Sequence, residues 1–493
     1  MPDQFGRGAI WLGRGTTRRV VVAAFLVFGV PVSVCLAMLT PPGQVADEPA
    51  HLLRADALLR GQLIGHRVTE HSPEGIERTV SGVEADAALL PMWSLLQAQG
   101  NRLTQPLLDQ VRSVTWAGKL KFAQLSNVAV YPPIFYLPAA LGLGSAKLLG
   151  AGPFHAMLAG RLANVLAFSA LGLMALLSAR RCHRMLFCIL CLPMTLCLAG
   201  SMNQDGLIIG TCALTAALLT RGDAGRSGMA YGFSCLLISC VVIVKPPYLP
   251  LATMLLLPLP SFRSWRIERA LFVRRVWLAI IVVLPCLAWV FFAARYLAAQ
   301  TPVPPYHPGP LWPRDPAITF VTFDAGAQLA VLRADPRRLF TLPWLSLIHN
   351  GNSILEAIGI LGWLSIFLPA SLYDFWKFSA AAALTGDAID GRKAGWNPRW
   401  LDSTLLLLAA AACVWAVYLS QYLAWTHVGA SSIDGIQGRY FLPILPFIAL
   451  AIPQLDVPWS RLPRAACTLA VVAAAAAGLV VLPRLIVLSF YLH

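Results

Sequence analysis

The sequence has little charge, and acidic residues are especially scarce. Charged residues make up 12% of the 493 positions, with 23 Asp and Glu against 38 Lys and Arg. A soluble globular chain carries about twice that charged fraction. Hydrophobic residues make up 57% of the chain, and the mean hydropathy is +0.67. These values exclude an ordinary soluble domain and predict an integral membrane protein.

The usual nucleotide and metal motifs are also missing from the sequence. It contains no GxxxxGK[ST], no GxGxxG, no HExxH and no HxxxH. Such motifs cradle phosphates or bring two ligands to one metal ion. Ten of the eleven cysteines lie in hydrophobic stretches and Cys182 lies in a short basic loop, so we expect packing residues without disulfides. No cofactor is therefore predicted. The His and acidic residues after the first span are compatible with a divalent metal ion, but no motif specifies one.

Long hydrophobic runs, in contrast, are abundant. Residues 20–39 follow Arg14, Arg18 and Arg19, are too long for a signal-peptide core, and form the first predicted span. Continuous apolar runs favour helices over a barrel. We therefore predict an all-α, polytopic transmembrane bundle with about 11 spans (roughly 10 to 13). The expected spans are 20–39, 157–178, 185–200, 206–220, 229–244, 248–260, 276–297, 353–373, 403–424, 441–455 and 465–490.

The basic residues predict the orientation of the bundle. With the N-terminal residues 1–19 in the cytoplasm, most arginines fall in inside loops, and the short outside turns hold only Lys245 and Arg439. This asymmetry matches the positive-inside rule. The net charge of +15 then reflects topology and predicts no nucleic-acid partner.

Residues 20–490 then form a single transmembrane domain with two long outside loops, 41–156 and 298–352. In the first loop we expect helices at 48–60 and 106–125. Residues 131–150 contain three prolines and could span or lie at the surface. We treat them as juxtamembrane, because a span there would put the following arginine cluster outside.

Polar residues gather at the predicted outside edge, first around Asp47 and Glu48. In a helix over 48–60, Asp47, His51 and Arg54 share one face. A carboxylate beside a histidine and an arginine can act as a general base. Asp47 is equally well explained as a helix N-cap, with Pro49 in the first turn.

Four further groups lie at the same edge. They comprise Asn203 and Asp205 in a tight turn, Lys245 at a helix break, Gln437 and Arg439 beside two glycines, and Arg161 with Asn164 in the second span. Each could bind an anionic or hydroxyl-bearing ligand. Turn formation, snorkelling and a local salt bridge are the structural alternatives.

Six sequence motifs, in this order along the chain, resemble those of a known family: PPGQVADEPAH, YPPIFYLP, RLAN, SMNQDG, KPPY and GIQGRYFLPILP. The chain resembles the bacterial membrane-protein family known as domain of unknown function 2142, which is itself similar to the GT-C polyprenol-dependent glycosyltransferases. The resemblance implies that Asp47 or Glu48 is the catalytic acid in the first outward loop. It also implies a polyprenyl-phosphate sugar donor whose phosphate is neutralised by Lys245, Arg439 or Arg161.

The implied function is sugar transfer to a glycan or lipid-linked acceptor on the outer face of the bacterial inner membrane, in cell-envelope glycan assembly. Two alternatives remain open. One is a transporter or flippase of lipid-linked sugars, and the other is a non-catalytic scaffold of a glycan-assembly complex. The absence of a large soluble C-terminal domain points to an acceptor that is lipid-linked or reached through 298–352.

Overall fold

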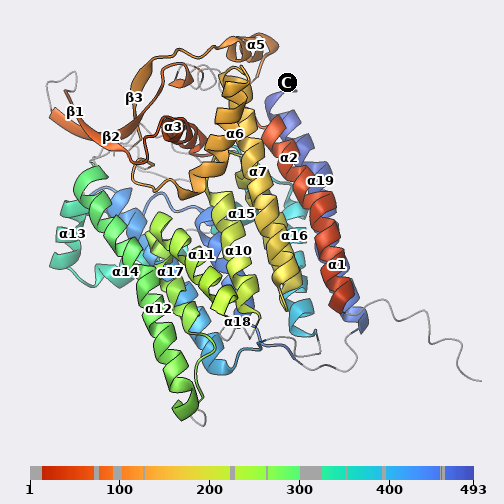
Figure 1. Ribbon diagram of the computed structural model, residues 1–493. Coiled ribbons are helices and arrows are strands. Elements are labelled where there is room, and N and C mark those ends of the chain that lie inside the picture. Colours follow the sequence, from red (N-terminus) through yellow and green to blue (C-terminus); the bar gives the residue numbers. More distant parts are fainter. Residues whose placement is uncertain are drawn as a thin grey trace, which may run out of the picture.

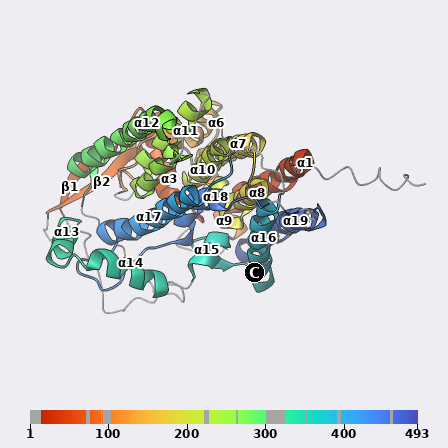
Figure 2. The ribbon, with the colours of Figure 1, turned by 90° about the horizontal axis from the view of Figure 1, so that it is seen from below.

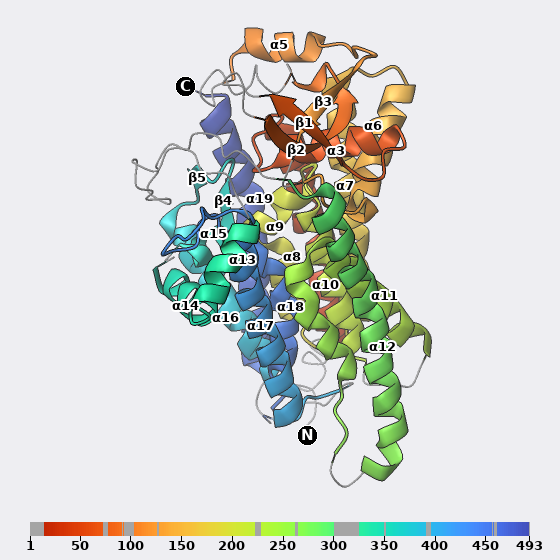
Figure 3. The same ribbon diagram turned by 90° about the vertical axis from the view of Figure 1, so that its left-hand side faces the viewer.

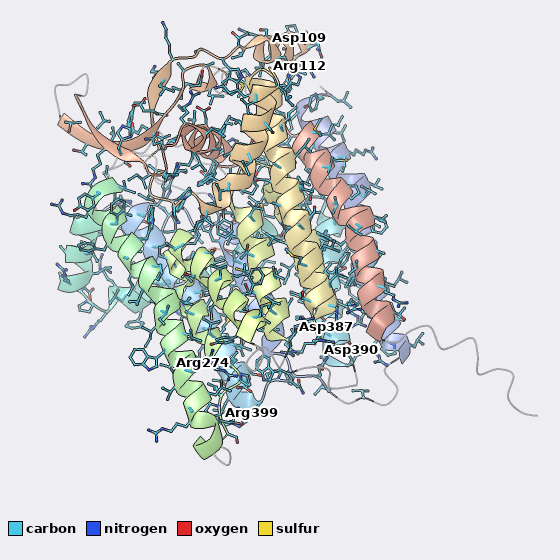
Figure 4. All side chains as sticks on the ribbon, in the orientation of Figure 1. Asp109, Arg112, Arg274, Asp387, Asp390 and Arg399 are labelled. Carbon is cyan, nitrogen blue, oxygen red and sulfur yellow. The ribbon has the colours of Figure 1, made fainter. Side chains whose placement is uncertain are left out.

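The computed structural model describes residues 14–71, 77–90, 92, 103–125, 128–221, 228–261, 265–299, 325–349, 352–390, 396–455, 457 and 461–492. Helices run between two ends of the molecule, which we call the cap end and the basal end (Figure 1). Asp109 and Arg112 mark the cap end, and Arg274, Asp387 and Arg399 mark the basal end (Figure 4).

Long apolar helices form the frame of the molecule. Within the described residues, five are long and apolar enough to cross a bilayer, as a helix of about 20 residues can. They are α1, a π-turn and α2 together (Arg14–Ala24, Phe25–Gly29 and Val30–Leu39), α7 (Pro153–Ser178), α12 with its terminal π-turn (Trp265–Phe292 and Ala293–Leu297), α17 (Trp400–Ala424) and α19 (Arg461–Phe490). The prediction of a membrane protein is therefore confirmed.

Shorter helices fill the centre of the bundle. Every residue of α8 (His183–Cys191), α9 (Pro193–Ala199) and α10 (Asp205–Leu219) is buried. Figure 2 shows these helices near the middle of the projection, with α12 and α19 toward its edges. Around them lie α11 (Gly228–Val244), the 3-10 helix Pro246–Leu256, the 3-10 helix Gly438–Ile444 and α18 (Leu445–Ala451).

The eleven predicted spans are not confirmed as such. The stretch 185–200 is broken between α8 and α9 at Pro193, which has no N–H for a continuous helix. The stretch 353–373 comprises α15 (Ser353–Gly359), a small hairpin of β4 (Ile360–Leu361) and β5 (Ile366–Phe367), and the start of α16 (Ala370–Ala388). The stretch 248–260 is largely a 3-10 helix.

A cap covers one end of the bundle and is built from the chain between α2 and α7. It contains α3 (Glu48–Leu59), which confirms the helix predicted at 48–60, and a three-stranded antiparallel sheet in the order β1-β2-β3. The remaining elements are β1 (His66–His71), β2 (Glu77–Asp86), α5 (Gln105–Ser113), β3 (Leu120–Gln124), a 3-10 turn (Ile134–Tyr136) and α6 (Leu137–Leu148). Figure 3 shows the sheet and α5 at the end where the chain terminates.

The helix predicted at 106–125 is wrong in its second half. Helix α5 ends at Ser113, and Gly118 adopts a positive φ of 63°, a conformation that glycine adopts without steric cost. The chain then pairs as β3 with β2, where Lys121 faces Ala85 in the register. The described part of the chain is thus mostly helical, with two small sheets that an all-α prediction omits.

Part of the second long loop packs beside α17. Helices α13 (Ala325–Ala334) and α14 (Arg338–His349) lie there, and residues 300–324 of the predicted loop fall outside the described residues. The Gln328 amide donates to the carbonyls of Tyr422, Thr426 and His427, at 3.0, 3.1 and 2.8 Å. It thereby caps the C-terminal end of α17.

Candidate functional site at the cap end of the bundle

Glu48 and Arg161 form a closed ion pair beneath the cap. Arg161 donates from Nε to Glu48 Oε1 at 2.7 Å and from Nη2 to Oε2 at 2.6 Å, and neither side chain is exposed. The Glu48 carboxylate also accepts the N–H groups of Gly43 and Met202, both at 3.0 Å. The remaining Arg161 donors bind the carbonyls of Ala37, Thr40 and Pro41. The hydrogen-bonding capacity of the Glu48 carboxylate and of the Arg161 guanidinium is thus satisfied within the protein.

Asp47 has a different environment from its neighbour. Its side chain is 32% exposed and forms an ion pair with Nη2 of Arg439, whose own side chain is 2% exposed. Asp47 adopts a positive φ of 65° and makes no side-chain cap bond to α3. Asp47 thus occupies the N-cap position of α3, but the capping role predicted for its side chain is wrong. The left-handed backbone turns its carboxylate toward Arg439, which also donates to the Ala46 carbonyl at 3.3 Å.

A second ion pair joins the same cluster. Lys245 Nζ lies 3.2 Å from Asp205 Oδ1, and Arg439 Nε lies 4.0 Å from Asp205 Oδ2. The Lys245 ammonium lies 4.9 Å from the ring centre of Tyr131 and 5.8 Å from that of Tyr440. Two carboxylates and two cations, with two tyrosine faces, thus meet where the ends of α3, α10, α11 and the 3-10 helix Gly438–Ile444 converge.

His51 lines the cluster from α3. Its Nδ1 lies 2.6 Å from the Tyr136 hydroxyl, and the ring is buried. Burial lowers the pKa of His51 to about 4, although the nearby Asp47 and Asp205 carboxylates oppose the shift. The ring is therefore neutral at physiological pH and can offer one nitrogen to Tyr136 and the other to a neighbour.

The other predicted residues mostly hold the backbone in place. Arg54 donates to the carbonyls of Gln62, Leu63 and Tyr131, at 3.0, 2.5 and 3.3 Å, so it does not join the Asp47 cluster as its helical spacing suggested. The Asn164 amide donates to Ser201 O at 2.8 Å.

Asn203 shapes the turn that precedes α10. Its Oδ1 accepts the Asp205 N–H at 2.9 Å, which orients the start of α10. Gln437 lies two residues before Arg439. Its Oε1 is buried without a hydrogen bond in the described part of the chain.

A family model described as "Predicted membrane protein (DUF2142)" matches residues 31–448. The chain belongs to this family. Among curated proteins and among solved structures, none matches the chain. The region matched by the DUF2142 model includes every residue of the cluster, from Asp47 to Arg439, whereas α19 lies beyond it.

The cluster does not fit a divalent metal. Within the described residues, no group of three or more His, Cys, Asp or Glu side chains could hold a metal ion. The carboxylates of Asp47 and Asp205 are already neutralised by Arg439 and Lys245. A bound divalent cation would have to displace Arg439 and Lys245 from these carboxylates.

Sequence reasoning missed the aromatic residues of the site. Tyr131 and Tyr136 belong to the phrase YPPIFYLP, and Tyr440 follows Arg439 directly. Glu356 of α15 also supports the site, because its Oε2 accepts the Gly438 N–H at 2.6 Å and so holds the backbone beside Arg439. Tyrosines that flank charged groups near a membrane surface were the available signal.

Proposed function

We propose that this DUF2142 protein is a membrane glycosyltransferase that transfers a sugar from a polyprenyl-phosphate donor to a glycan or lipid-linked acceptor. The observation that carries the proposal is the cluster of Asp47, Asp205, Lys245 and Arg439, which joins sequence segments far apart in the chain. The likeness to GT-C enzymes, which use an acid directly after the first span, supports the assignment of this cluster as the active site.

Asp47 is the general base in this proposal, and Glu48 is structural. The Asp47 carboxylate is partly exposed, whereas the Glu48 carboxylate has no exposure and is saturated by Arg161 and two backbone N–H groups. A base must reach the proton that it removes within about 3 Å, directly or through one water. Of these two carboxylates, Asp47 satisfies that requirement.

The proposed step is a displacement at the anomeric carbon of the donor. The acceptor hydroxyl gives its proton to Asp47 while its oxygen forms the new bond to that carbon. The bond between the carbon and the phosphate oxygen breaks, and the leaving polyprenyl phosphate keeps the electron pair. Lys245 and Arg439 would stabilise the charge that develops on this phosphate, as fixed cations in a dry site do effectively.

The remaining polar atoms suit a sugar. Gln437 Oε1 and Arg439 Nε are buried without a hydrogen bond in the described part of the chain, so a sugar hydroxyl could satisfy them. His51, which is neutral, can donate or accept one further hydrogen bond. Tyr131 and Tyr440 present ring faces beside Lys245, a surface that also suits the apolar face of a sugar ring.

The proposed location is the bacterial inner membrane, with the N-terminus in the cytoplasm and the cap on the outer face. The positive-inside distribution of arginines supports this orientation. A transporter or flippase would need polar residues along a path between the two ends. Helix α10, at the centre of the bundle, carries one charged residue, Asp205, at its cap-side end. This distribution favours chemistry at the cap end over transport.

The test uses the purified protein and the lipid-linked sugars of its native membrane. Mass spectrometry measures how much polyprenyl phosphate the protein releases from them. Asp47→Asn should lower the release about 10²- to 10⁴-fold, the usual contribution of a general base. Asp109→Asn makes the same chemical change on α5, where the side chain is 60% exposed, and should leave release unchanged. If neither the wild type nor the Asp47→Asn protein releases polyprenyl phosphate, the result would favour the scaffold or flippase alternatives.

A further inference from the structure

A basic surface at the basal end has no part in the proposed reaction. It is formed by the starts of α12 and α17, and Figure 4 places Arg274 and Arg399 there, at the end opposite Arg112. We call it the basal patch. Its members are Arg269, Arg274 and Trp277 of α12, and Arg399 and Trp400 at the start of α17.

The arginines of α12 are available to a ligand. Arg269 and Arg274 are exposed, and within the described residues neither has an ion-pair partner. Residues 263–275 contain five arginines and one acidic residue, Glu268. Glu268 is engaged by the Ser261 N–H at 3.2 Å. Within the part of the chain that the structure describes, no carboxylate therefore neutralises Arg269 or Arg274.

Residues 258–259 bond to both helices of the patch and so hold the two helices in a fixed relation. Arg275 donates to the Pro258 carbonyl at 2.7 Å, and Asp402 accepts the Leu259 N–H at 2.9 Å. Arg399 bonds to both the Asp402 carboxylate and the Leu259 carbonyl. The Arg399 side chain, which is 41% exposed, is therefore held at a defined place beside the 258–259 segment, to which Arg275 of α12 also bonds.

Two tryptophans follow these arginines closely in the chain. Trp277 is 62% exposed and Trp400 is 74% exposed, although tryptophan is normally a residue of cores and membrane interfaces. Trp277 lies three positions after Arg274, so the two side chains are neighbours on the helix surface. Both helices are long enough to cross the bilayer, with Arg269 and Arg274 in the first two turns of one candidate span and Arg399 directly before the other. Such a position places these arginines at the level of lipid headgroups.

We propose that the basal patch is a binding site for the phosphate headgroup of an anionic phospholipid. The arginines supply charge-assisted donors for the phosphate, and the tryptophans pack on the glycerol and upper acyl region. A soluble phosphate compound would have no use for two exposed indoles. Positive-inside topology alone accounts for the sign of the charge, but not for Arg399, which is bonded to the 258–259 segment and is followed in the chain by an exposed indole.

The experiment uses the full chain in detergent and native mass spectrometry with added phosphatidylglycerol or phosphatidylcholine. The wild-type protein should retain phosphatidylglycerol preferentially. Each arginine at a membrane surface contributes about a fivefold preference, so Arg274→Gln should lower it about fivefold and the double change Arg269→Gln/Arg274→Gln roughly 30-fold. Arg112→Gln, an exposed helical arginine at the cap end, is the matched control and should leave it unchanged.

Lysine substitutions at 269 and 274 test the chemistry of the site. They should restore most of the preference for phosphatidylglycerol, because charge is the main determinant at a headgroup. The proposal is overturned if wild type shows no preference between the two lipids, or if Arg112→Gln lowers it as much as Arg274→Gln. Inorganic phosphate at millimolar concentration should not displace the lipid, and its displacement would instead indicate a soluble phosphate ligand.

Discussion

Arg161 and Glu48 lie 113 positions apart in the chain and form a two-pronged ion pair that is wholly enclosed by protein. The pair joins α7 to the start of α3. Its other bonds reach the end of α2 and the turn before α10, through Thr40 and Met202. A charged pair in such a place fixes the helices that surround the site, and it leaves the neighbouring Asp47 free to face Arg439.

The first prediction is that Glu48→Gln destabilises the protein. The change leaves the Arg161 guanidinium buried without its counter-charge, and breaking a buried ion pair costs about 3–5 kcal/mol. We expect a clearly lower unfolding temperature in detergent. Glu84→Gln, at a side chain that is 37% exposed, is the control. Equal thermal stability of the two variants would contradict the structural role of Glu48.

The sequence could indicate the residues of the site but not their partners. The phrases around Asp47, Asp205, Lys245 and Arg439 were recognisable because polar groups at a membrane edge need an explanation. The choice between Asp47 and Glu48 depends on which carboxylate meets Arg161, a contact across 113 positions. Periodicity carries no information on such a contact. The same holds for Arg54. Its spacing placed it on one helix face with Asp47 and His51, but its guanidinium binds backbone carbonyls instead of joining them.

The fold was predictable in part for similar reasons. Long apolar runs identified α7, α12, α17 and α19, because a span is a local property of the sequence. The cap sheet was missed because β2 and β3 pair across an intervening helix, α5. Short buried helices such as α8 and α9 were merged into one span, since composition alone does not distinguish a buried core helix from a membrane helix.

The second prediction concerns Arg439→Lys. Arginine bonds both the Asp47 carboxylate and the Ala46 carbonyl and approaches Asp205, a set that requires a planar group with several donors. A lysine ammonium at this position can keep the charge but not this geometry. We expect at least a tenfold loss of polyprenyl-phosphate release with normal membrane insertion. Activity equal to that of the wild type would show that charge alone suffices at this position.

The third prediction is a loss of stability in mild acid that depends on His51. Its pKa is about 4 in the folded protein and 6.5 in an unfolded chain, so only the unfolded state binds the proton between these values. Stability is therefore complete above pH 6.5 and falls as the pH drops toward 4. The full shift corresponds to roughly 3 kcal/mol.

The measurement for His51 is the unfolding temperature at pH 7 and pH 4.5, compared between wild type and His51→Gln. Glutamine can keep a hydrogen bond to Tyr136 but does not titrate, so the variant should lose less stability on acidification. His66→Gln changes a histidine that is 42% exposed and should behave as the wild type does. A His51→Gln variant with the full acid sensitivity of the wild type would locate the effect in other groups.

The fourth prediction concerns Gly438, which allows the backbone before Arg439 to approach α15. A Cβ atom at this position would lie 2.2 Å from the Ser353 carbonyl oxygen and 2.5 Å from the Ala357 nitrogen, too close for either to remain in place. Gly438→Ala should therefore separate the segment from Glu356 and displace Arg439. We expect loss of polyprenyl-phosphate release together with a lower unfolding temperature.

Gly232→Ala is the matched control, because a Cβ there meets no atom within 4 Å and alanine favours the helix. That variant should be as active as the wild type and at least as stable, and an active Gly438→Ala protein would show that the close approach to α15 is not needed to present Arg439.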